Sequence, residues 1–371
     1  MRVLVEIAQQ TNVHLFKNII WELEKRGHKV MIVARNRELT LQLLDIYGFK
    51  YISLSTAKPG LIQLFKEMLE RDIKMVRIVK RFKPDMLVGH TTCFTHVSKL
   101  TGVRSILDHD DGRAGGFLFW FSYPFADVYC TPSCLRGNFG EKHVKYKGYK
   151  ELAYLHPNHF KPNPEILNEL GLKEDEKFFV LRFSALQAVH DVGKKGIGIE
   201  MRREIIKELE KYGKVFISSE ANMSSEFERY RIPVLPHKVH DMLYYAQMYI
   251  GDSQTMASEA AVLGTPSIRS NSFVGKISYL EELENRYGLT YGFKVEDQGE
   301  MLKKIKELSQ DKNLKERWLE KRKRMLKEKI DVAQFLVEFI EDFPQSFYDY
   351  KRKHSAEKPQ PNKGHRLHGF H

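Results

Sequence analysis

The chain has 371 residues, of which 42% are hydrophobic and 29% charged, and a formal net charge of +12. This composition can bury a core, which excludes a disordered protein, and the length predicts two domains. No run approaches the roughly 20 apolar residues of a membrane span. The chain starts with the strand-like MRVLVEIA, so no signal peptide is expected, and three cysteines build no disulfide framework. We therefore expect a cytoplasmic protein.

The basic excess is unevenly distributed along the chain. Residues 1–165 carry a net charge of +9, residues 166–310 of −2 and residues 311–371 of +5. A basic region of this kind is typical of proteins that bind nucleic acid, an anionic membrane surface or an acidic substrate. Which of these partners applies depends on the motifs that the sequence contains.

The first half alternates short, continuously apolar runs with stretches of helical apolar periodicity. This alternation predicts a parallel sheet with helices on both faces. The expected strands are Arg2–Ala8, Val30–Ala34, Tyr51–Leu54, Met86–Val88, Ser105–Leu107 and Asp127–Cys130. The expected helices are Leu15–Arg26, Glu38–Tyr47 and Leu61–Phe82.

The alternation stops at Tyr154–Pro164, which is expected to be a linker, and then resumes. The strands expected after it are Phe178–Arg182, Val215–Ser218, Met248–Gly251 and Ser267–Arg269. The helices expected after it are Met201–Tyr212, Asp241–Ala246, Met256–Leu263, Asn313–Lys329 and Val332–Ile340. The predicted fold class is α/β, with two Rossmann-like domains facing across a cleft at the carboxyl ends of their strands. The expected parts are residues 1–157, residues 158–330, a C-terminal helix at 331–350 and a basic, disordered tail at 351–371.

The segment YIGDSQTMASEAAVLGTP, residues 249–266, combines a strand, a small polar turn and an alanine-rich helix. Asp252, Ser253 and Thr255 stand where such a helix presents unpaired N–H groups and the positive end of its dipole, which favours a diphosphate. Glu259, one helical turn beyond Thr255, is suited to accept hydrogen bonds from a ribose diol. The alternative is an ordinary strand–helix unit in which Ser253 or Thr255 caps the helix.

This segment resembles the nucleotide-sugar site of the GT-B superfamily, which includes glycosyltransferases and UDP-N-acetylglucosamine 2-epimerase. More narrowly, the chain is similar to the DUF354 family of archaeal and bacterial GT-B-like proteins. The supporting stretches are residues 14–35, 81–90, 124–132, 147–157, 180–185 and 242–266. The resemblance implies that Asp252, Ser253, Thr255 and Met256 lie against phosphates and that Glu259 holds the ribose. It also implies that residues 158–330 bind the nucleotide sugar and residues 1–157 the acceptor.

Two further segments are candidates for the nucleotide-sugar site. Arg182 and Ser184 end the strand that opens the second domain, and the Arg182 guanidinium is suited to bidentate pairing with phosphate oxygens. His237 and His240 lie in LPHKVHDML, residues 235–243, and the resemblance implies contact of this loop with the base. The alternative for each histidine is a solvent-exposed side chain.

The first domain offers the candidate catalytic residues. Three carboxylates, a histidine and an arginine follow the strand Ser105–Leu107, and repulsion among them is expected to raise at least one pKa, as a general base requires. Asp110 or Asp111 is the candidate base. The alternative is a turn in which Asp108 caps the next helix, and a divalent metal is not required by the spacing. Epimerases place a glutamate in a comparable loop, whereas this sequence offers Asp110 or Asp111. This difference counts against epimerase chemistry.

The third catalytic candidate is His14, expected to start the first helix with its N-terminus toward the cleft. The polar residues before it, Gln9–Asn12, replace a second histidine that the family more commonly has there. This favours a role for His14 in binding an acceptor hydroxyl.

The sequence predicts a GT-B glycosyltransferase that uses a nucleotide-diphosphate sugar, expected to be a UDP-sugar, and a glycan or lipid-linked acceptor. No tightly bound cofactor is expected. The alternatives are a nucleotide-sugar 2-epimerase and a non-enzymatic protein that binds an anionic surface or nucleic acid, although no nucleic-acid motif is present. The basic amphipathic helix Leu61–Phe82 has two interpretations: its apolar stripe packs on the sheet, which is favoured, or it lies on an anionic membrane at the inner face of the cell.

Overall fold

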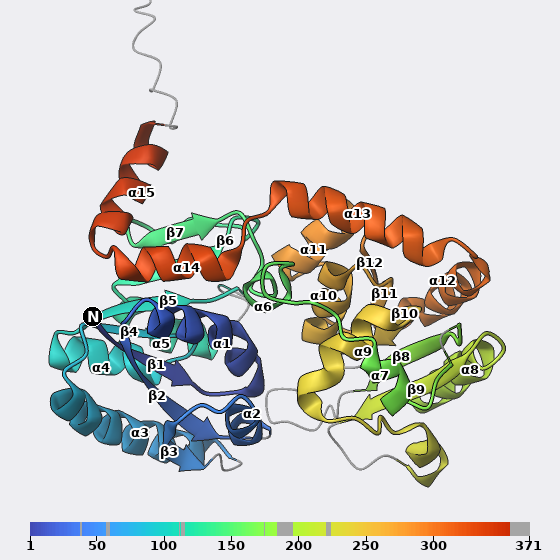
Figure 1. Cartoon of the computed structure of the whole chain (residues 1–371), viewed down its shortest axis with the longest axis horizontal. Helices are drawn as coiled ribbons and strands as arrows, with labels where there is room; N and C mark the ends of the chain where they lie inside the picture. Colours follow the sequence, from blue (N-terminus) through green and yellow to red (C-terminus); the bar gives the residue numbers. More distant parts are fainter. Residues whose placement is uncertain are drawn as a thin grey trace, which may run out of the picture.

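The computed structural model describes residues 1–37, 39–56, 60–110, 112, 116–173, 175–183, 196–219 and 224–356. These residues form two α/β domains, each built on one parallel sheet, which lie side by side in Figure 1. Asp111 and Ser184, two of the predicted site residues, lie outside the described residues. Within the described residues, no helix has both the length and the apolar character that a membrane span needs.

The first domain contains a seven-stranded sheet in the order β3-β2-β1-β4-β5-β6-β7. Side chains of β1 alternate between the two faces, because Val3 and Val5 pack in a different core cluster from Leu4. The strands are β1 (Arg2–Ile7), β2 (Lys29–Asn36), β3 (Tyr51–Thr56), β4 (Met86–Gly89), β5 (Arg104–Asp108), β6 (Val128–Pro132) and β7 (His143–Tyr146). The helices are α1 (Gln10–Lys25), α2 (Thr40–Ile46), α3 (Leu61–Phe82), α4 (Cys93–Thr101), α5 (Phe117–Ser122), the 3-10 helix η2 (Tyr123–Phe125) and α6 (Leu152–Leu155).

The second domain contains a five-stranded sheet in the order β12-β11-β10-β8-β9. Its strands are β8 (Phe178–Phe183), β9 (Lys214–Ser219), β10 (Met248–Gly251), β11 (Ser267–Ser270) and β12 (Thr290–Phe293). Its helices are α7 (Glu165–Glu169), α8 (Ile199–Leu209), η4 (Ser225–Tyr230), η5 (Pro236–Lys238), α9 (Val239–Tyr245), α10 (Gln254–Leu263), α11 (Ser278–Asn285), η6 (Val295–Asp297), α12 (Gln298–Gln310) and α13 (Leu314–Glu328).

The C-terminal part of the chain returns to the first domain. After α13, helix α14 (Val332–Glu341) packs beside α1, and Glu341 accepts hydrogen bonds from Arg26 at 2.7 Å and from His28 at 2.9 Å. Figure 1 shows this crossing from the second domain to the first. The predicted C-terminal helix is thus a part of the first domain in space.

The last helix, α15 (Gln345–Ala356), extends into the region expected to be disordered. The Tyr350 hydroxyl accepts a hydrogen bond from the Lys145 N–H at 2.8 Å, and Lys351 Nζ donates to the His143 carbonyl at 3.0 Å. These contacts to β7 hold the helix against the sheet edge. The prediction that disorder begins at residue 351 is therefore wrong for residues 351–356, which are helical.

Helix α3 has the predicted bounds, and only part of its apolar stripe has the favoured packing. Val76 and Val79 pack in a core cluster of the first domain, whereas Phe65, Leu69 and Ile73 are exposed. In the first half of α3, polar contacts occupy the side that faces the sheet.

Candidate functional site

The predicted phosphate-binding turn joins β10 to α10 at the carboxyl edge of the second sheet. Ser253 is the N-cap residue of α10, and its hydroxyl accepts the Met256 N–H at 3.4 Å. Asp252 is buried beside this turn, and the Asn271 side chain donates to its carbonyl at 2.8 Å. The Ser253 cap and the positive end of the α10 dipole are therefore at the same turn, where Thr255 belongs to the first turn of the helix.

Arg182 ends at the same sheet edge as this turn. Its β8 position pairs with Gly251 of β10, and the Asp252 N–H donates to the Arg182 carbonyl at 3.1 Å. A Cβ added to Gly251 would lie 2.4 Å from that carbonyl oxygen, which explains the glycine. The guanidinium donates to the Ser218 hydroxyl at 2.6 Å from Nη1. The structure therefore brings Arg182, Asp252 and Ser253 together.

Glu259 lies where the two domains meet, and this contact region is called the domain junction below. The Tyr154 hydroxyl donates to Glu259 Oε1 at 2.9 Å, and His240 Nε2 lies 3.0 Å from the same oxygen. All three side chains are buried. The expected cleft is thus bridged at this point, and one carboxylate oxygen of Glu259 is already engaged by the protein.

His14 faces the same junction from the first domain. It lies in the second turn of α1, because the helix begins at Gln10; the expectation that His14 starts the helix is wrong. The polar residues before it are helical because Asn12 Oδ1 accepts the Ala8 N–H at 3.2 Å and fixes the turn. The His14 ring packs against His240, with 4.7 Å between centroids.

The surroundings of His14 favour a neutral imidazole. Burial, followed by the nearby His240, Lys17 and His237, holds the pKa of His14 well below its usual value of 6.5. Among the described residues, His14 Nδ1 has no hydrogen-bond partner. His237 itself is half-buried on η5, and burial together with Lys238 lowers its pKa. Both histidines are therefore suited to hydrogen bonding as neutral rings.

Asp110 follows β5 in a buried charged cluster of the first domain. Lys150 Nζ lies 2.5 Å from Asp110 Oδ2, and His90 Nε2 lies 3.7 Å from Oδ1. Burial opposes ionisation of this carboxyl, but Lys150, then His90 and His109, outweigh it and lower the pKa of Asp110 to about 2. The expected raised pKa is wrong for Asp110, because the sequence did not show that Lys150 would pair with it.

At the domain junction, Glu151 is a carboxyl with a raised pKa, which the sequence did not indicate. Burial raises the pKa of Glu151 to about 7, against the neighbouring Lys150 charge. The Ser258 hydroxyl of α10 donates to Glu151 Oε1 at 2.6 Å, and Oε2 has no hydrogen-bond partner among the described residues. The hydrogen bond from Ser258 to Glu151 is therefore a second contact of a carboxylate across the domain junction, in addition to the one between Tyr154 and Glu259.

The cluster holds a third carboxyl, Asp108, in place of the predicted helix cap. Asp108 is buried at the end of β5, and its oxygens have no hydrogen bond within the described part of the chain. His90 Nδ1 lies 3.7 Å from Asp108 Oδ2. No group of three or more His, Cys, Asp or Glu side chains among the described residues is arranged to hold a metal ion.

Two Rossmann-like domains in one chain belong to the GT-B class of fold, which solved glycosyltransferases and nucleotide-sugar epimerases share. The sequence matches the family described as "Protein of unknown function (DUF354)" over residues 1–340, and the chain belongs to this family. An uncharacterized protein of Methanocaldococcus jannaschii is 24% identical over 284 residues, which are 72% of this chain and 80% of that protein.

Solved structures share the fold at low sequence identity. One is a putative UDP-N-acetylglucosamine 2-epimerase from Listeria monocytogenes, with a TM-score of 0.64, 14% identity, and coverage of 97% of this chain and 98% of that chain. Another is a glycosyltransferase of Streptomyces sp. SF2575, with a TM-score of 0.58, 12% identity, and coverage of 92% and 100%. This likeness confirms the predicted fold class.

Proposed function

We propose that this chain is a glycosyltransferase that transfers a sugar from a nucleotide-diphosphate sugar, a UDP-sugar, to a glycan or lipid-linked acceptor. The proposal rests on the buried Glu259 of α10, which follows a capped helix N-terminus and contacts His240, whose ring packs on His14 of the other domain. The fold shared with glycosyltransferases and epimerases supports nucleotide-sugar chemistry.

The donor binds to the second domain in this proposal. The N-terminus of α10, with Asp252, Ser253, Thr255 and Met256, lies against the diphosphate, because helix N–H groups and the helix dipole favour an anion. Arg182 adds a positive charge at the same edge and stabilises the departing diphosphate, so no resident metal is required. Ser184, the next residue in the sequence after β8, is proposed to contact the donor as well.

Glu259 holds the ribose and His237 the base. Glu259 Oε1 is engaged by Tyr154 and His240, and the second oxygen accepts from the ribose diol. Since Glu259 is buried at the domain junction, the domains separate for the donor to enter and close around it afterwards. Closure excludes water from the transferred sugar.

The acceptor binds to the first domain. A base with a pKa near 2 is a weak proton acceptor, so ionised Asp110 acts there by electrostatic stabilisation with Lys150. Asp111 is the proposed base, and neutral His14 binds the acceptor hydroxyl.

A nucleotide-sugar 2-epimerase is the second candidate. The observation in its favour is that Asp110 and Glu151 have pKa values moved in opposite directions, to about 2 and about 7. A carboxyl that titrates near neutral pH, such as Glu151, can give and take a proton, while ionised Asp110 supplies a fixed negative charge to the same site.

One reaction experiment separates the two candidates. The purified chain is incubated with each UDP-sugar alone and then with a membrane lipid extract, and the sugar is followed by proton NMR. The transferase proposal predicts no change of the sugar alone and release of UDP when the extract is added. Inversion at C2 of the sugar without an acceptor would overturn it in favour of the epimerase.

A further inference from the structure

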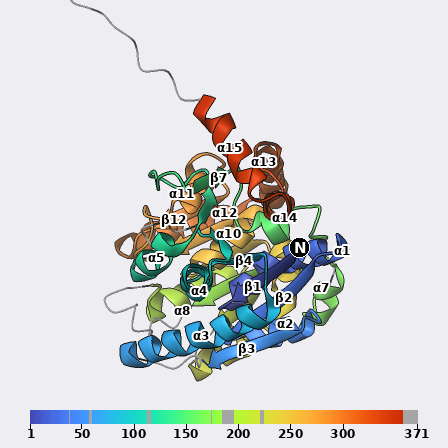
Figure 2. The same ribbon diagram turned by 90° about the vertical axis from the view of Figure 1, so that its left-hand side faces the viewer.

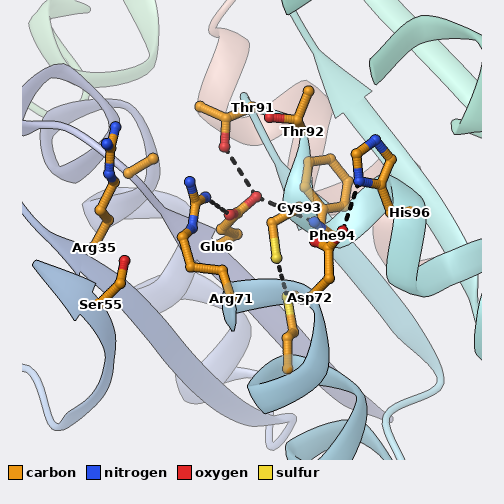
Figure 3. Close-up of polar contacts among 12 residues, drawn as sticks. Glu6, Arg35, Ser55, Arg71, Asp72, Thr91, Thr92, Cys93, Phe94 and His96 are labelled. Carbon is orange, nitrogen blue, oxygen red and sulfur yellow. Dashed lines mark hydrogen bonds and ion pairs between the residues drawn. The ribbon is translucent and has the colours of Figure 1, made fainter. Parts of the chain in front are cut away.

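Helix α3 turns charged side chains toward the first sheet. Glu67 and Arg71 are both buried. Glu67 accepts two hydrogen bonds from the Arg35 guanidinium, at 2.7 and 2.6 Å, and Arg71 Nη2 donates to Glu6 Oε1 at 2.5 Å. Figure 3 shows Arg71 reaching Glu6 beside Thr91. Ion pairs thus attach the first half of α3 to the sheet, where apolar contacts would normally do so.

Three apolar side chains of α3 point to solvent instead. Phe65, Leu69 and Ile73 have exposed fractions of 42%, 60% and 54%. Their spacing of four residues places them in one line along the helix. Exposed apolar side chains in a continuous line mark an interaction site more often than scattered ones do.

Neighbouring elements extend this line into a face. The rings of Phe65 and Phe121 lie 6.2 Å apart, which joins α3 to α5, and Trp120 of α5 is 59% exposed. Helix α4 is held in the same face by His96, whose ring nitrogens lie 2.9 Å from Asp72 Oδ2 and 2.6 Å from the Phe121 carbonyl. The α3–α5 face is defined here as Phe65, Leu69, Ile73, Trp120 and the exposed Phe125 of η2. Figure 2 looks onto α3, α4 and α5 from this side of the molecule.

The charges around the α3–α5 face are mainly basic. Four exposed basic residues lie on α3: Lys66, Arg77, Lys80 and Arg81. Two acidic side chains of the helix are engaged locally, Glu70 with Lys74 at 2.7 Å and Asp72 with His96. Apolar and aromatic side chains flanked by lysine and arginine match the acyl–headgroup boundary of an anionic bilayer, where both kinds of side chain are stabilised.

We propose that the α3–α5 face binds the surface of an anionic phospholipid bilayer. The exposed apolar line inserts below the headgroups, and the four basic residues pair with lipid phosphates. The inference does not depend on the proposed activity, since it concerns a surface outside the nucleotide-sugar residues.

Vesicle co-sedimentation tests the proposal. The full chain is spun with phosphatidylcholine vesicles and with vesicles that also contain phosphatidylglycerol, at low and high salt. The test variant is Phe65→Ser/Leu69→Ser/Ile73→Ser, and the matched control replaces two exposed apolar residues of the second domain, Ile199→Ser/Leu235→Ser. Circular dichroism and melting temperature establish that both variants are folded.

We expect the wild-type chain and the control to bind the anionic vesicles, with binding lowered by salt, and the triple variant to bind about tenfold more weakly. Glu259→Ala should bind vesicles like the wild type, whatever its effect on nucleotide binding. Equal recovery with both kinds of vesicle, or an unchanged triple variant, would overturn the proposal. A wild-type dimer that the triple variant converts to a monomer, without vesicle binding, would assign the face to a second copy of the chain instead.

Discussion

The hydroxyl of Tyr154 lies 2.9 Å from Glu259 Oε1, and this hydrogen bond joins α6 of the first domain to α10 of the second. His240 reaches the same oxygen at 3.0 Å. A buried carboxylate shared in this way links the relative position of the domains to the group proposed to hold the ribose.

Replacing Tyr154 with phenylalanine removes one hydrogen bond from a buried carboxylate. We expect Tyr154→Phe to lower the free energy of unfolding by about 1–3 kcal/mol, because Glu259 keeps only His240. Urea unfolding measures the change. The control is Tyr212→Phe, whose hydroxyl makes a 3.5 Å contact with Glu208, and it should change stability by less than about 0.5 kcal/mol. Equal effects of the two variants would contradict the junction contact.

The raised pKa of Glu151 predicts a pH effect on stability. In the unfolded chain this carboxyl has an ordinary pKa near 4.5, whereas in the folded protein the pKa is about 7. Between these values the folded state holds the extra proton, so its stabilisation is largest at low pH and is lost as the pH rises through 7.

Glu151→Gln isolates this effect because the amide cannot ionise. Relative to the wild type, the variant should gain about 2 kcal/mol of stability when the pH is raised from about 5.5 to about 8. Urea unfolding of both proteins at the two pH values gives the difference, and other titrating groups cancel in the comparison. A constant difference between the two proteins would show that Glu151 has an ordinary pKa.

The pair of Arg71 and Glu6 makes a buried ion pair under α3. Arg71→Met leaves the Glu6 carboxylate buried without its charge partner and should cost about 3–5 kcal/mol in unfolding free energy. Adding Glu6→Gln removes the unpaired charge, so the double variant should be more stable than Arg71→Met alone. If the two changes are additive in a double-mutant cycle, the pair is not coupled.

Gly251 ends β10 against the backbone of Arg182. Gly251→Ala should destabilise the chain by about 2 kcal/mol or more, since its Cβ would lie 2.4 Å from a carbonyl oxygen that cannot move aside. Gly299→Ala is the control: nothing lies within 4 Å of its Cβ, and alanine in helix α12 should stabilise by about 0.5–1 kcal/mol. Melting temperatures report both changes, and a neutral Gly251→Ala would refute the close approach of the strands.

The strand and helix pattern was predictable where periodicity is long. The bounds of α3 agree with those expected from sequence, and the strand that ends at Gly251 was found with the helix after it. Strands β7 (HVKY) and β12 (TYGF) were missed, because neither forms a continuously apolar run like the one by which the equally short β10 (MYIG) was found.

The site was only partly predictable, since its decisive contacts join residues far apart in the chain. Tyr154 lies at the edge of an expected linker, yet it reaches Glu259. Glu151 has a raised pKa because α10 and the neighbouring helices bury it, and Asp110 has a lowered pKa because Lys150 pairs with it. The inward direction of Glu67 and Arg71 depends on Arg35 and Glu6 in the sheet. The periodicity of a helix does not predict which residues from distant parts of the chain will pair with it.

We propose that α10 and Glu259 bind a nucleotide-diphosphate sugar. Isothermal titration calorimetry with a UDP-sugar that raises the melting temperature tests it most directly, using the wild type, Glu259→Ala and the distant Glu300→Ala. We predict saturable binding by the wild type and by Glu300→Ala, and binding weaker by about tenfold or more in Glu259→Ala. No binding of any nucleotide-diphosphate sugar by the wild type, or equal affinity of all three proteins, would contradict the account.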